Sequence, residues 1–406
     1  MEHAQDAQPV DGVPTRVVGY AYPWDVIGDP DFAHRVTDLG IGEVSLAATY
    51  HGTRAATPLH PEHRLVEAPY AALYRPVRDS AWTGRGLTPV AARWVDAADP
   101  FAEAARLLAD RDLRVHAWVV LAHSTRLGLL RPDLVVRNCF GDPYSYALCP
   151  AHDEVRDYAT TLAVEAVRDV AVSGVSVEGL GQLGVAHNGL HEKTDGAYGS
   201  AAQRVLSVCC CAGCQKTWAT AGLDSSEVVD RLRAALLAVQ QGTQPAAATM
   251  AQLLGDELAA ALLAARHASQ SAVRRMVFQA LADVAPGARI TLHGQPDPWA
   301  TGPSPAVTDA VFGAEFEVGA GRVGAVLVPA WPATPATYSS IGDARRLAPR
   351  TVSVGAYVTV LPPADPGTVL AHARAVLAAG ADELHLYHLG LANRSQLDRL
   401  GELARL

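Results

Sequence analysis

One glutamate stands alone in an otherwise uncharged stretch of small and β-branched residues. Glu178 closes the sequence Gly-Val-Ser-Val-Glu, residues 174–178, which reads as a short buried strand ending at the carboxylate. A carboxyl group in such a place loses contact with water, and desolvation raises its pKa toward the range of a general acid. The opposing interpretation is a structural carboxylate that caps the next loop or pairs with an arginine.

The segment after Glu178 is dense in titratable and hydrogen-bonding side chains. Within nine residues it contains His187, Asn188, His191, Glu192, Lys193 and Asp195. His187 and His191 are four residues apart, a spacing that places two metal ligands on one face of a helix, although Gly189 disfavours a regular helix there. The other interpretation is a substrate-binding loop in which Glu192 supplies a second carboxylate.

Four of the six cysteines have the spacing of a metal site. Cys209, Cys211 and Cys214 form a C-x-C-x2-C pattern, and Cys149 or a histidine can supply the fourth ligand. Four soft thiolates are the ligand set of a structural zinc ion. Buried free thiols and redox chemistry are the alternatives, and disulfides are not expected in a reducing compartment.

Eight short apolar runs alternate with amphipathic stretches along the chain. The runs cover residues 16–23, 43–49, 114–123, 174–181, 289–293, 323–329, 351–360 and 383–388. The helical patterns cover residues 31–39, 100–110, 153–172, 203–219, 225–284 as a pair, 341–347, 366–379 and 395–406. This alternation predicts an α/β fold, a (β/α)8 TIM barrel. A doubly wound sheet is the alternative, but the first turn lacks the glycines of a nucleotide-binding site.

Two insertions interrupt the regular spacing. The first, residues 51–99, lies between the second strand and the second helix, and the second is a helical extension after strand four. Residues 1–13 are predicted to be a disordered tail, and residues 14–406 a single barrel domain.

The predicted strand ends are rich in aromatic and histidine side chains. Aromatic faces with interleaved hydrogen-bonding groups suit a sugar ring, which has apolar faces and a rim of hydroxyl groups. The predicted substrate-binding residues are Tyr22, Trp24, Tyr50, His51, Trp118, His123, His187, Asn188, His191, Lys193, His293, Asp297, Trp331, Tyr387 and His388. For any one of these rings the alternative is an ordinary core residue.

Two motifs carry a resemblance to a known family. Residues 148–158 read Leu-Cys-Pro-Ala-His-Asp-Glu-Val-Arg-Asp-Tyr and lead, through a helix, to the strand that ends at Glu178. This arrangement resembles family-10-like glycoside-hydrolase barrel proteins, in which an N-P-x-x-P-E-V-R-x-Y stretch precedes an acidic residue on strand four. The C-x-C-x2-C element is also similar to what such barrels carry. By this resemblance Glu178 takes the place of the strand-four acid. The chain departs from the family pattern on strand seven, where residues 354–358 contain no carboxylate.

These observations favour a glycoside hydrolase in which Glu178 is the general acid. Glu192, Asp25 or Asp297 would then be the nucleophile or base. One alternative is a metal-dependent lyase, isomerase or hydrolase that uses His187 and His191. Another is a catalytically inert barrel that binds a sugar.

Composition narrows the remaining classes of function. The chain has 406 residues, a formal net charge of −9 and 18% charged residues, so nucleic acid is not an expected partner. The only lysines are Lys193 and Lys216, which disfavours Schiff-base chemistry. No apolar run is long enough for a membrane span and no signal peptide is visible, so the expected location is cytoplasmic. We expect an oligosaccharide or a small molecule as the substrate. We expect no organic cofactor. The sequence leaves open whether the chain forms a homo-oligomer.

Overall fold

Eight parallel strands form a closed barrel in the computed structural model, which describes residues 15–187, 193–194, 196–299, 323–362 and 364–406. The strands are β1 Arg16–Ala21, β2 Glu43–Tyr50, β6 Arg114–Val120, β9 Gly174–Glu178, β10 Arg289–His293, β11 Val323–Pro329, β12 Ser353–Thr359 and β13 Glu383–Tyr387. Each strand pairs with the next along the chain, and β1 pairs with both β2 and β13, which closes the ring. The predicted (β/α)8 barrel is therefore confirmed, and an open doubly wound sheet is excluded. The predicted tail, residues 1–13, lies outside the described residues.

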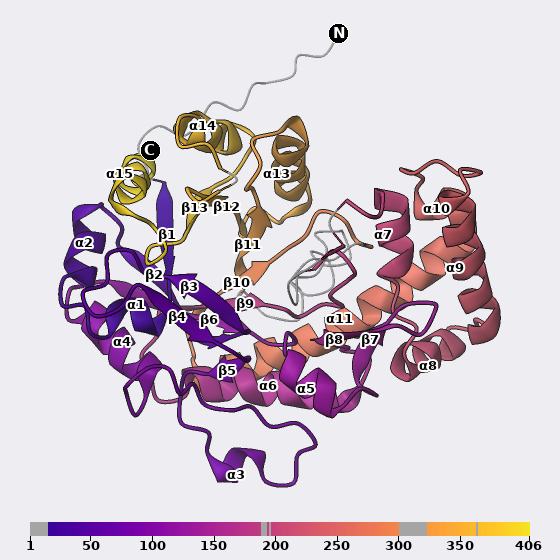
Figure 1. Ribbon diagram of the computed structural model, residues 1–406, viewed down its shortest axis with the longest axis horizontal. Helices are drawn as coiled ribbons and strands as arrows, with labels where there is room; N and C mark the ends of the chain where they lie inside the picture. Colours follow the sequence, from indigo (N-terminus) through magenta and orange to yellow (C-terminus); the bar gives the residue numbers. More distant parts are fainter. Residues whose placement is uncertain (1–14, 188–192, 195, 300–322, 363) are drawn as a thin grey trace.

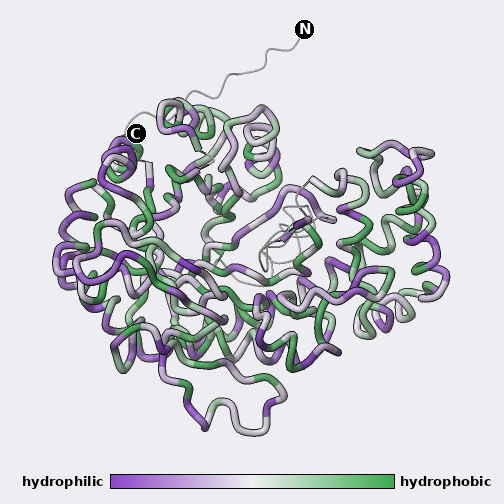
Figure 2. The backbone as a smooth tube through the Cα atoms, viewed as in Figure 1, coloured by the Kyte–Doolittle hydropathy of each residue, from purple (hydrophilic) through white to green (hydrophobic). Residues whose placement is uncertain are grey.

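Helices surround this barrel (Figure 1). They include α2 Phe32–Asp38, α4 Pro100–Ala109, α6 Asp153–Val167, α11 Asp256–Val284, α13 Pro335–Leu347, α14 Val369–Ala378 and α15 Arg394–Leu403. In α4, the Asp99 side chain accepts a hydrogen bond from the backbone of Ala102, and Phe101 and Leu108 are buried against the strands. Figure 2 shows hydrophobic and hydrophilic residues alternating along such helices, as amphipathic helices require. Among the described residues, no helix combines the length and apolar character needed to cross a membrane.

The segment between β2 and α4 is folded into short elements of its own. It holds a hairpin of β3 Thr53–Ala56 and β4 Leu65–Ala68, the two-residue strand β5 Ala72–Leu73 and the short helix α3 Asp79–Trp82. β5 pairs antiparallel with the end of β2. A short helix, α1 Pro23–Val26, follows β1.

The second large extension combines parts from two neighbouring connections. After β6 come α5 Thr125–Leu130 and a hairpin of β7 Val135–Arg137 and β8 Pro143–Leu148; after β9 come α7 Ser200–Leu206, α8 Ala212–Thr220, α9 Ser225–Gln240 and α10 Met250–Leu254. The helices α7 to α10 lie to one side of the barrel (Figure 1). They share a hydrophobic core with the hairpin, with members such as Tyr144, Trp218, Leu232, Leu236 and Leu262.

Two helix predictions are corrected here. The continuous helix predicted over residues 203–219 is wrong, because the chain leaves the helix at residues 207–211 and the Cys210 amide donates a hydrogen bond to the Arg137 carbonyl of β7 at 2.7 Å. The predicted helical pair over 225–284 is three helices. Gly255, with a φ of 86°, separates α10 from α11, a conformation that favours glycine.

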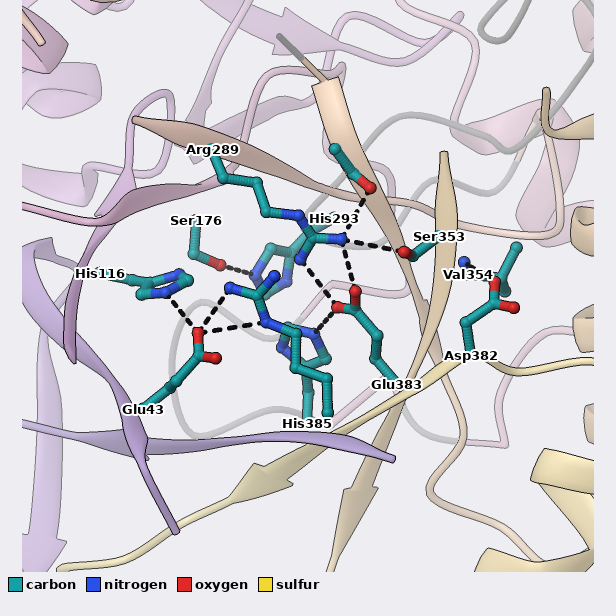
Figure 3. Close-up of polar contacts among 12 residues, drawn as sticks. Glu43, His116, Ser176, Arg289, His293, Ser353, Val354, Asp382, Glu383 and His385 are labelled. Carbon is teal, nitrogen blue, oxygen red and sulfur yellow. Dashed lines mark hydrogen bonds and ion pairs between the residues drawn. The ribbon is translucent and has the colours of Figure 1, made fainter. Parts of the chain in front are cut away.

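The amino-terminal end of the barrel is filled by charged groups rather than by aliphatic side chains. Glu43, the first residue of β2, binds Arg16 and Arg114, and its Oε2 lies 2.9 Å from Nε2 of the buried His116. Figure 3 shows this cluster inside the ring of strands, beside a second one built on Glu383. The strand sequences, which read as apolar runs, did not predict these ion pairs.

We expect the Glu43→Gln variant to show how much the ionised Glu43 carboxylate contributes to the stability of the protein at each pH. Desolvation alone would raise the pKa of Glu43, but hydrogen bonds with His116, Arg16 and Arg114 lower it from 4.5 to about 2. A carboxyl group with a depressed pKa in the folded state stabilises the protein above its unfolded pKa and loses that effect as the pH falls through the folded pKa. This shift corresponds to about 3 kcal/mol.

Urea unfolding of both proteins between about pH 2 and pH 7 measures the effect. The wild type should be more stable than Glu43→Gln by about 3 kcal/mol above about pH 5, and the difference should vanish near pH 2. Glu67→Gln, at an exposed position on β4, is the control for loss of a carboxylate. Equal stability of wild type and Glu43→Gln at neutral pH would contradict the assignment.

Candidate active site

Glu178 is the last residue of β9, and its carboxyl group is buried. The Trp118 indole N–H donates a hydrogen bond to its Oε2 at 2.8 Å, and Nδ1 of His293 lies 3.5 Å from the same oxygen. Desolvation raises the pKa of Glu178 from 4.5 to about 7, although the Trp118 hydrogen bond lowers it. At neutral pH this carboxyl group can therefore hold a proton and release it.

Aromatic rings from three strand ends surround this carboxyl group. The Trp118 ring meets the edge of Tyr50 at a centroid distance of 4.6 Å, and the Tyr22 ring packs edge-on against Tyr50 at 4.9 Å. Trp24 and His388 both stack on Tyr22 with centroids 4.3 Å away, and both are buried. These stacking contacts fix the position of Tyr22.

A second aromatic group continues the ring of side chains on the strands that follow. The Tyr22 hydroxyl lies 3.4 Å from that of Tyr387, and Trp331 stacks on Tyr387 with centroids 5.4 Å apart. Trp331 is 40% exposed, while Tyr387 and its neighbour Tyr357 are largely buried. The structure thus brings the predicted aromatic residues together, and Trp331 presents a ring to solvent.

Three of the predicted histidines form a cluster beside the aromatic groups. The His51 ring stacks on Tyr50 at 4.1 Å and on His123 at 4.4 Å. Nε2 of His187 lies 3.1 Å from Nδ1 of His123, so one of these nitrogens donates to the other. His187 is therefore in contact with His123 in this structure, and its predicted metal partner His191 lies outside the described residues.

Asp25 occupies a position different from that of Glu178. Its Oδ2 accepts a hydrogen bond from the Tyr22 amide at 2.7 Å, which caps α1, and lies 3.8 Å from Nδ1 of His388. The backbone of Gly390 passes so close that a Cβ atom there would meet the carboxyl group. Burial raises the pKa of Asp25 to about 8.

The remaining predicted acidic and loop residues are Asp297, Lys193, Asn188, His191 and Glu192. Asp297 binds Arg204 of α7 at 2.8 Å and is thereby held toward the helical extension. Lys193 is exposed. The predictions for Asn188, His191 and Glu192 fall on residues outside the described part of the chain.

The three-dimensional arrangement is similar to solved structures of glycoside hydrolases. Over 97% of its length the chain matches the glycoside hydrolase domain of PgaB (BpsB) from Bordetella bronchiseptica, with a TM-score of 0.58, 14% identity and 99% of that chain covered. The chain has the (β/α)8 fold of glycoside hydrolases. No protein-family model matches its sequence, and no curated protein is significantly similar to it.

Two further structures share this fold. The match to alpha-L-fucosidase isoenzyme 2 from Paenibacillus thiaminolyticus has a TM-score of 0.57 and 12% identity, and covers 97% of this chain. The chain spans about half (49%) of that fucosidase. The match to the catalytic domain of beta-amylase from Paenibacillus polymyxa has a TM-score of 0.56 and 10% identity, and covers 95% of both chains.

In the glycoside hydrolase fold, active sites lie at the carboxyl ends of the barrel strands. Glu178, His293 and Tyr387 are the last residues of β9, β10 and β13. The candidate site therefore lies at the end of the barrel where this architecture places catalysis.

The four cysteines predicted to bind zinc converge in the core shared by the hairpin and the helical extension. The sulfur atoms of Cys149, Cys209, Cys211 and Cys214 are buried and lie within 4.8 Å of one another. Sγ of Cys149 is 3.6 Å from that of Cys214 and 3.7 Å from that of Cys209. Four sulfurs that each bind a central zinc ion at about 2.3 Å lie about 3.8 Å apart at the corners of a tetrahedron. The sulfur positions fit such an ion.

The residues that support these two sites were not among those predicted from the sequence. The Gln182 side-chain amide donates to the sulfurs of Cys149 and Cys214 at 3.4 and 3.0 Å, and its oxygen accepts from the buried Arg266 at 2.8 Å. Ser176 lies below Glu178 and bonds Nε2 of His293 at 2.8 Å. The period of two along a strand could have identified Ser176, because residues 176 and 178 point to the same side.

Proposed function

We propose that this protein is a glycoside hydrolase in which Glu178 is the general acid. The observation that carries the proposal is a buried carboxyl group, with a pKa raised to about 7, at the catalytic end of the barrel and among aromatic rings. Glycosidases need a carboxylic acid that remains protonated near neutral pH, so that it can protonate the departing oxygen.

The two carboxyl oxygens of Glu178 have different surroundings. Oε2 accepts from Trp118 and faces His293, whereas Oε1 has no hydrogen-bond partner among the described residues. We therefore assign Oε1 as the atom that carries the proton toward the glycosidic oxygen. Trp118 and His293 hold the carboxyl group in one orientation, which a positioned acid requires.

The proposed substrate is an oligosaccharide or a glycoside. The solvent-facing ring of Trp331, with Tyr387 behind it, offers an apolar surface for a sugar face. His51 and His123 lie on the opposite side of the aromatic group with ring nitrogens that can bind sugar hydroxyl groups. Two of the proteins with a similar structure are a fucosidase and an amylase, which supports a carbohydrate as the substrate class.

Glu192 is our choice for the second carboxylate. Asp25, with a pKa of about 8, is protonated at neutral pH and is a poor nucleophile in that form. Asp297 forms an ion pair with Arg204. Glu192 lies outside the described residues and keeps the role that its place in the loop after Glu178 predicts.

A second candidate function is sugar binding without catalysis. The seventh strand of the barrel, β12, carries Tyr357 where retaining glycosidases place a carboxylate. The Tyr357 hydroxyl is buried without a hydrogen-bond partner among the described residues. A protein that lacks the second carboxylate would bind sugars and leave them intact.

The pH dependence of hydrolysis tests the proposal. The panel should contain α-L-fucosides, β-galactosides and malto-oligosaccharides. Because an acid must be protonated to act, we expect kcat/KM to fall above about pH 7, by about tenfold for each further pH unit. Binding of a panel member without turnover at any pH would support the inert barrel instead.

We also propose that Cys149, Cys209, Cys211 and Cys214 bind a structural zinc ion. Cys149 follows β8, Cys209 and Cys211 lie between α7 and α8, and Cys214 lies in α8, so the ion would join the hairpin to the helical extension. The amide of Gln182 and the guanidinium of Arg266 provide the hydrogen bonds that support thiolate ligands. No position would remain for substrate, so the ion would have a structural role.

A further inference from the structure

The Trp331 ring is exposed, yet the backbone on both sides of it is held by hydrogen bonds. The residue lies in the connection between β11 and α13. Before it, the Ala330 amide donates to the Tyr357 carbonyl of β12 at 2.9 Å. After it, the Thr337 hydroxyl in the first turn of α13 donates to the Pro332 carbonyl at 2.7 Å. Exposed connections are usually more mobile than this, so the restraint on the Trp331 backbone needs an explanation.

The carbonyl group that precedes Trp331 is bound by a buried histidine. Nε2 of His372, on α14, lies 2.7 Å from the Ala330 carbonyl oxygen. The hydroxyl of Tyr338, on α13, lies 3.1 Å from Nδ1 of the same imidazole. The helices α13 and α14 lie side by side on the outside of the barrel (Figure 1). Two helices of the outer layer thus hold the backbone that carries Trp331.

The two contacts of His372 define where its proton lies. A carbonyl oxygen can only accept a hydrogen bond, so Nε2 carries the proton and donates to Ala330. In a neutral imidazole the other nitrogen is then an acceptor, and it accepts from the Tyr338 hydroxyl. Both nitrogens of this buried side chain therefore have partners, and the imidazole that holds Ala330 is itself held in one orientation.

The Trp331 ring is connected to the proposed acid through other aromatic rings. It stacks on Tyr387 with centroids 5.4 Å apart and an interplanar angle of 28°, and its centroid lies 6.1 Å from that of Tyr357. The Tyr387 ring meets the Trp118 ring at 6.4 Å, and Trp118 donates to Glu178. A sugar that stacks on Trp331 would therefore lie in the same site as Glu178.

We propose that His372 is a positioning residue that holds Trp331 in place as a stacking platform for a sugar ring. The proposal rests on the proposed function for its ligand, because the apolar face of a sugar is what the exposed indole would bind. His372 touches neither the sugar nor the reacting atoms. It acts through the Ala330 backbone.

A platform that is fixed before the sugar arrives binds it more tightly than a mobile one. Ordering a side chain or a loop during binding costs free energy, and that cost is subtracted from the affinity. His372 and Tyr338 restrain the Trp331 backbone in the free protein, so the cost is small. Removal of this restraint should weaken sugar binding. Because Glu178 keeps its own hydrogen bond from Trp118, the chemical step should be little affected.

Fluorine NMR of protein labelled with 5-fluorotryptophan, without sugar, tests the positioning. The chain has seven tryptophans, and the Trp331 signal is assigned with Trp331→Phe. His372→Leu removes both hydrogen bonds of the imidazole and keeps a buried apolar side chain. We expect it to shift or broaden the Trp331 signal and to leave the other tryptophan signals in place. His372→Gln, whose amide can still donate to the Ala330 carbonyl, should restore the wild-type signal.

A double-variant cycle of sugar binding tests the purpose of the platform. Affinity for α-L-fucosides, β-galactosides and malto-oligosaccharides is measured in Glu178→Gln protein, which should not consume the sugar. We expect Trp331→Ala to lower the affinity by about tenfold or more, and His372→Leu by about fivefold. Because His372 acts through Trp331, adding His372→Leu to Trp331→Ala should cause no further loss. With Glu178 present, His372→Leu should raise KM and leave kcat nearly unchanged.

His60→Leu is the matched control. The buried His60 also donates from Nε2 to a backbone carbonyl, that of Ile27, at 3.0 Å, and its loss should leave the Trp331 signal unchanged. If His372→Leu does not fold, Tyr338→Phe removes one of the two contacts of the imidazole and should also shift the Trp331 signal. A Trp331 signal that does not respond to loss of this anchor would overturn the proposal.

The positioning role and the proposed function can fail separately. Sugar binding that depends on His372, in a wild type that cleaves no glycoside, would refute only the proposed function. Hydrolysis by the wild type, together with losses of affinity that add up in the double variant, would refute only the role of His372. If no sugar of the panel binds, Trp331 is not a sugar platform and the proposal is overturned.

Discussion

Glu178→Gln should lower kcat/KM for oligosaccharides by about 10²- to 10⁴-fold, the usual contribution of a general acid. The glutamine amide has nearly the same shape and its oxygen can still accept the Trp118 hydrogen bond, so the fold should be retained. What the variant lacks is a proton that it can give to the leaving oxygen. Steady-state hydrolysis by both proteins at about pH 6, below the Glu178 pKa, measures the loss.

The control for removal of a buried carboxyl group is Glu165→Gln. Glu165 lies on α6 outside the barrel and binds Arg78 and Arg168. Its loss should lower the melting temperature and leave kcat/KM of the folded protein unchanged. Full turnover by Glu178→Gln, on any glycoside that the wild type cleaves, would show that another group is the acid.

Removal of one thiolate from the cysteine cluster should have the second largest effect. We expect one zinc ion per chain in the wild type and none in Cys214→Ser. We also expect a loss in the free energy of unfolding of about 4 kcal/mol or more, as is usual for loss of a structural metal. The reason is that the four sulfurs are buried between two segments that no disulfide joins. Elemental analysis and urea unfolding measure the two quantities.

Two neighbouring cysteines supply matched controls. Cys139 and Cys210 are buried thiols outside the group of four, so Cys139→Ser and Cys210→Ser should keep the zinc. A wild type free of metal and as stable as a zinc-loaded sample would contradict the zinc proposal. Zinc that survives Cys214→Ser but disappears in His191→Ala would instead support a metal-dependent enzyme.

The barrel could be predicted because each of its strands is buried on both faces. Such strands read as apolar runs, and in residues 323–329 the run and β11 agree residue for residue. The helical extension was predicted less well. Pairing of the Cys210 amide with Arg137 of β7 depends on a contact between segments over seventy residues apart in sequence, and no local pattern reports it.

The candidate site, like the fold, could be predicted from the sequence only in part. Glu178 could be identified because a lone carboxylate at a strand end is a local feature of the sequence. The position of Asp25 could not be predicted, because its contact with Gly390 joins segments near the two ends of the chain. The ion pairs of Glu43 and Glu383 were not predicted either, because each glutamate lies at the start of a strand and its partners come from other strands.

The most direct test of Glu178 as a glycosidase acid is the dependence of hydrolysis on the leaving group. A dinitrophenolate leaves without protonation, whereas a sugar hydroxyl group leaves only when an acid protonates it. We predict that Glu178→Gln retains most of its kcat/KM on a dinitrophenyl glycoside and loses about 10²-fold or more on the matching oligosaccharide. An equal loss on both substrates would contradict the assignment of Glu178 as the acid.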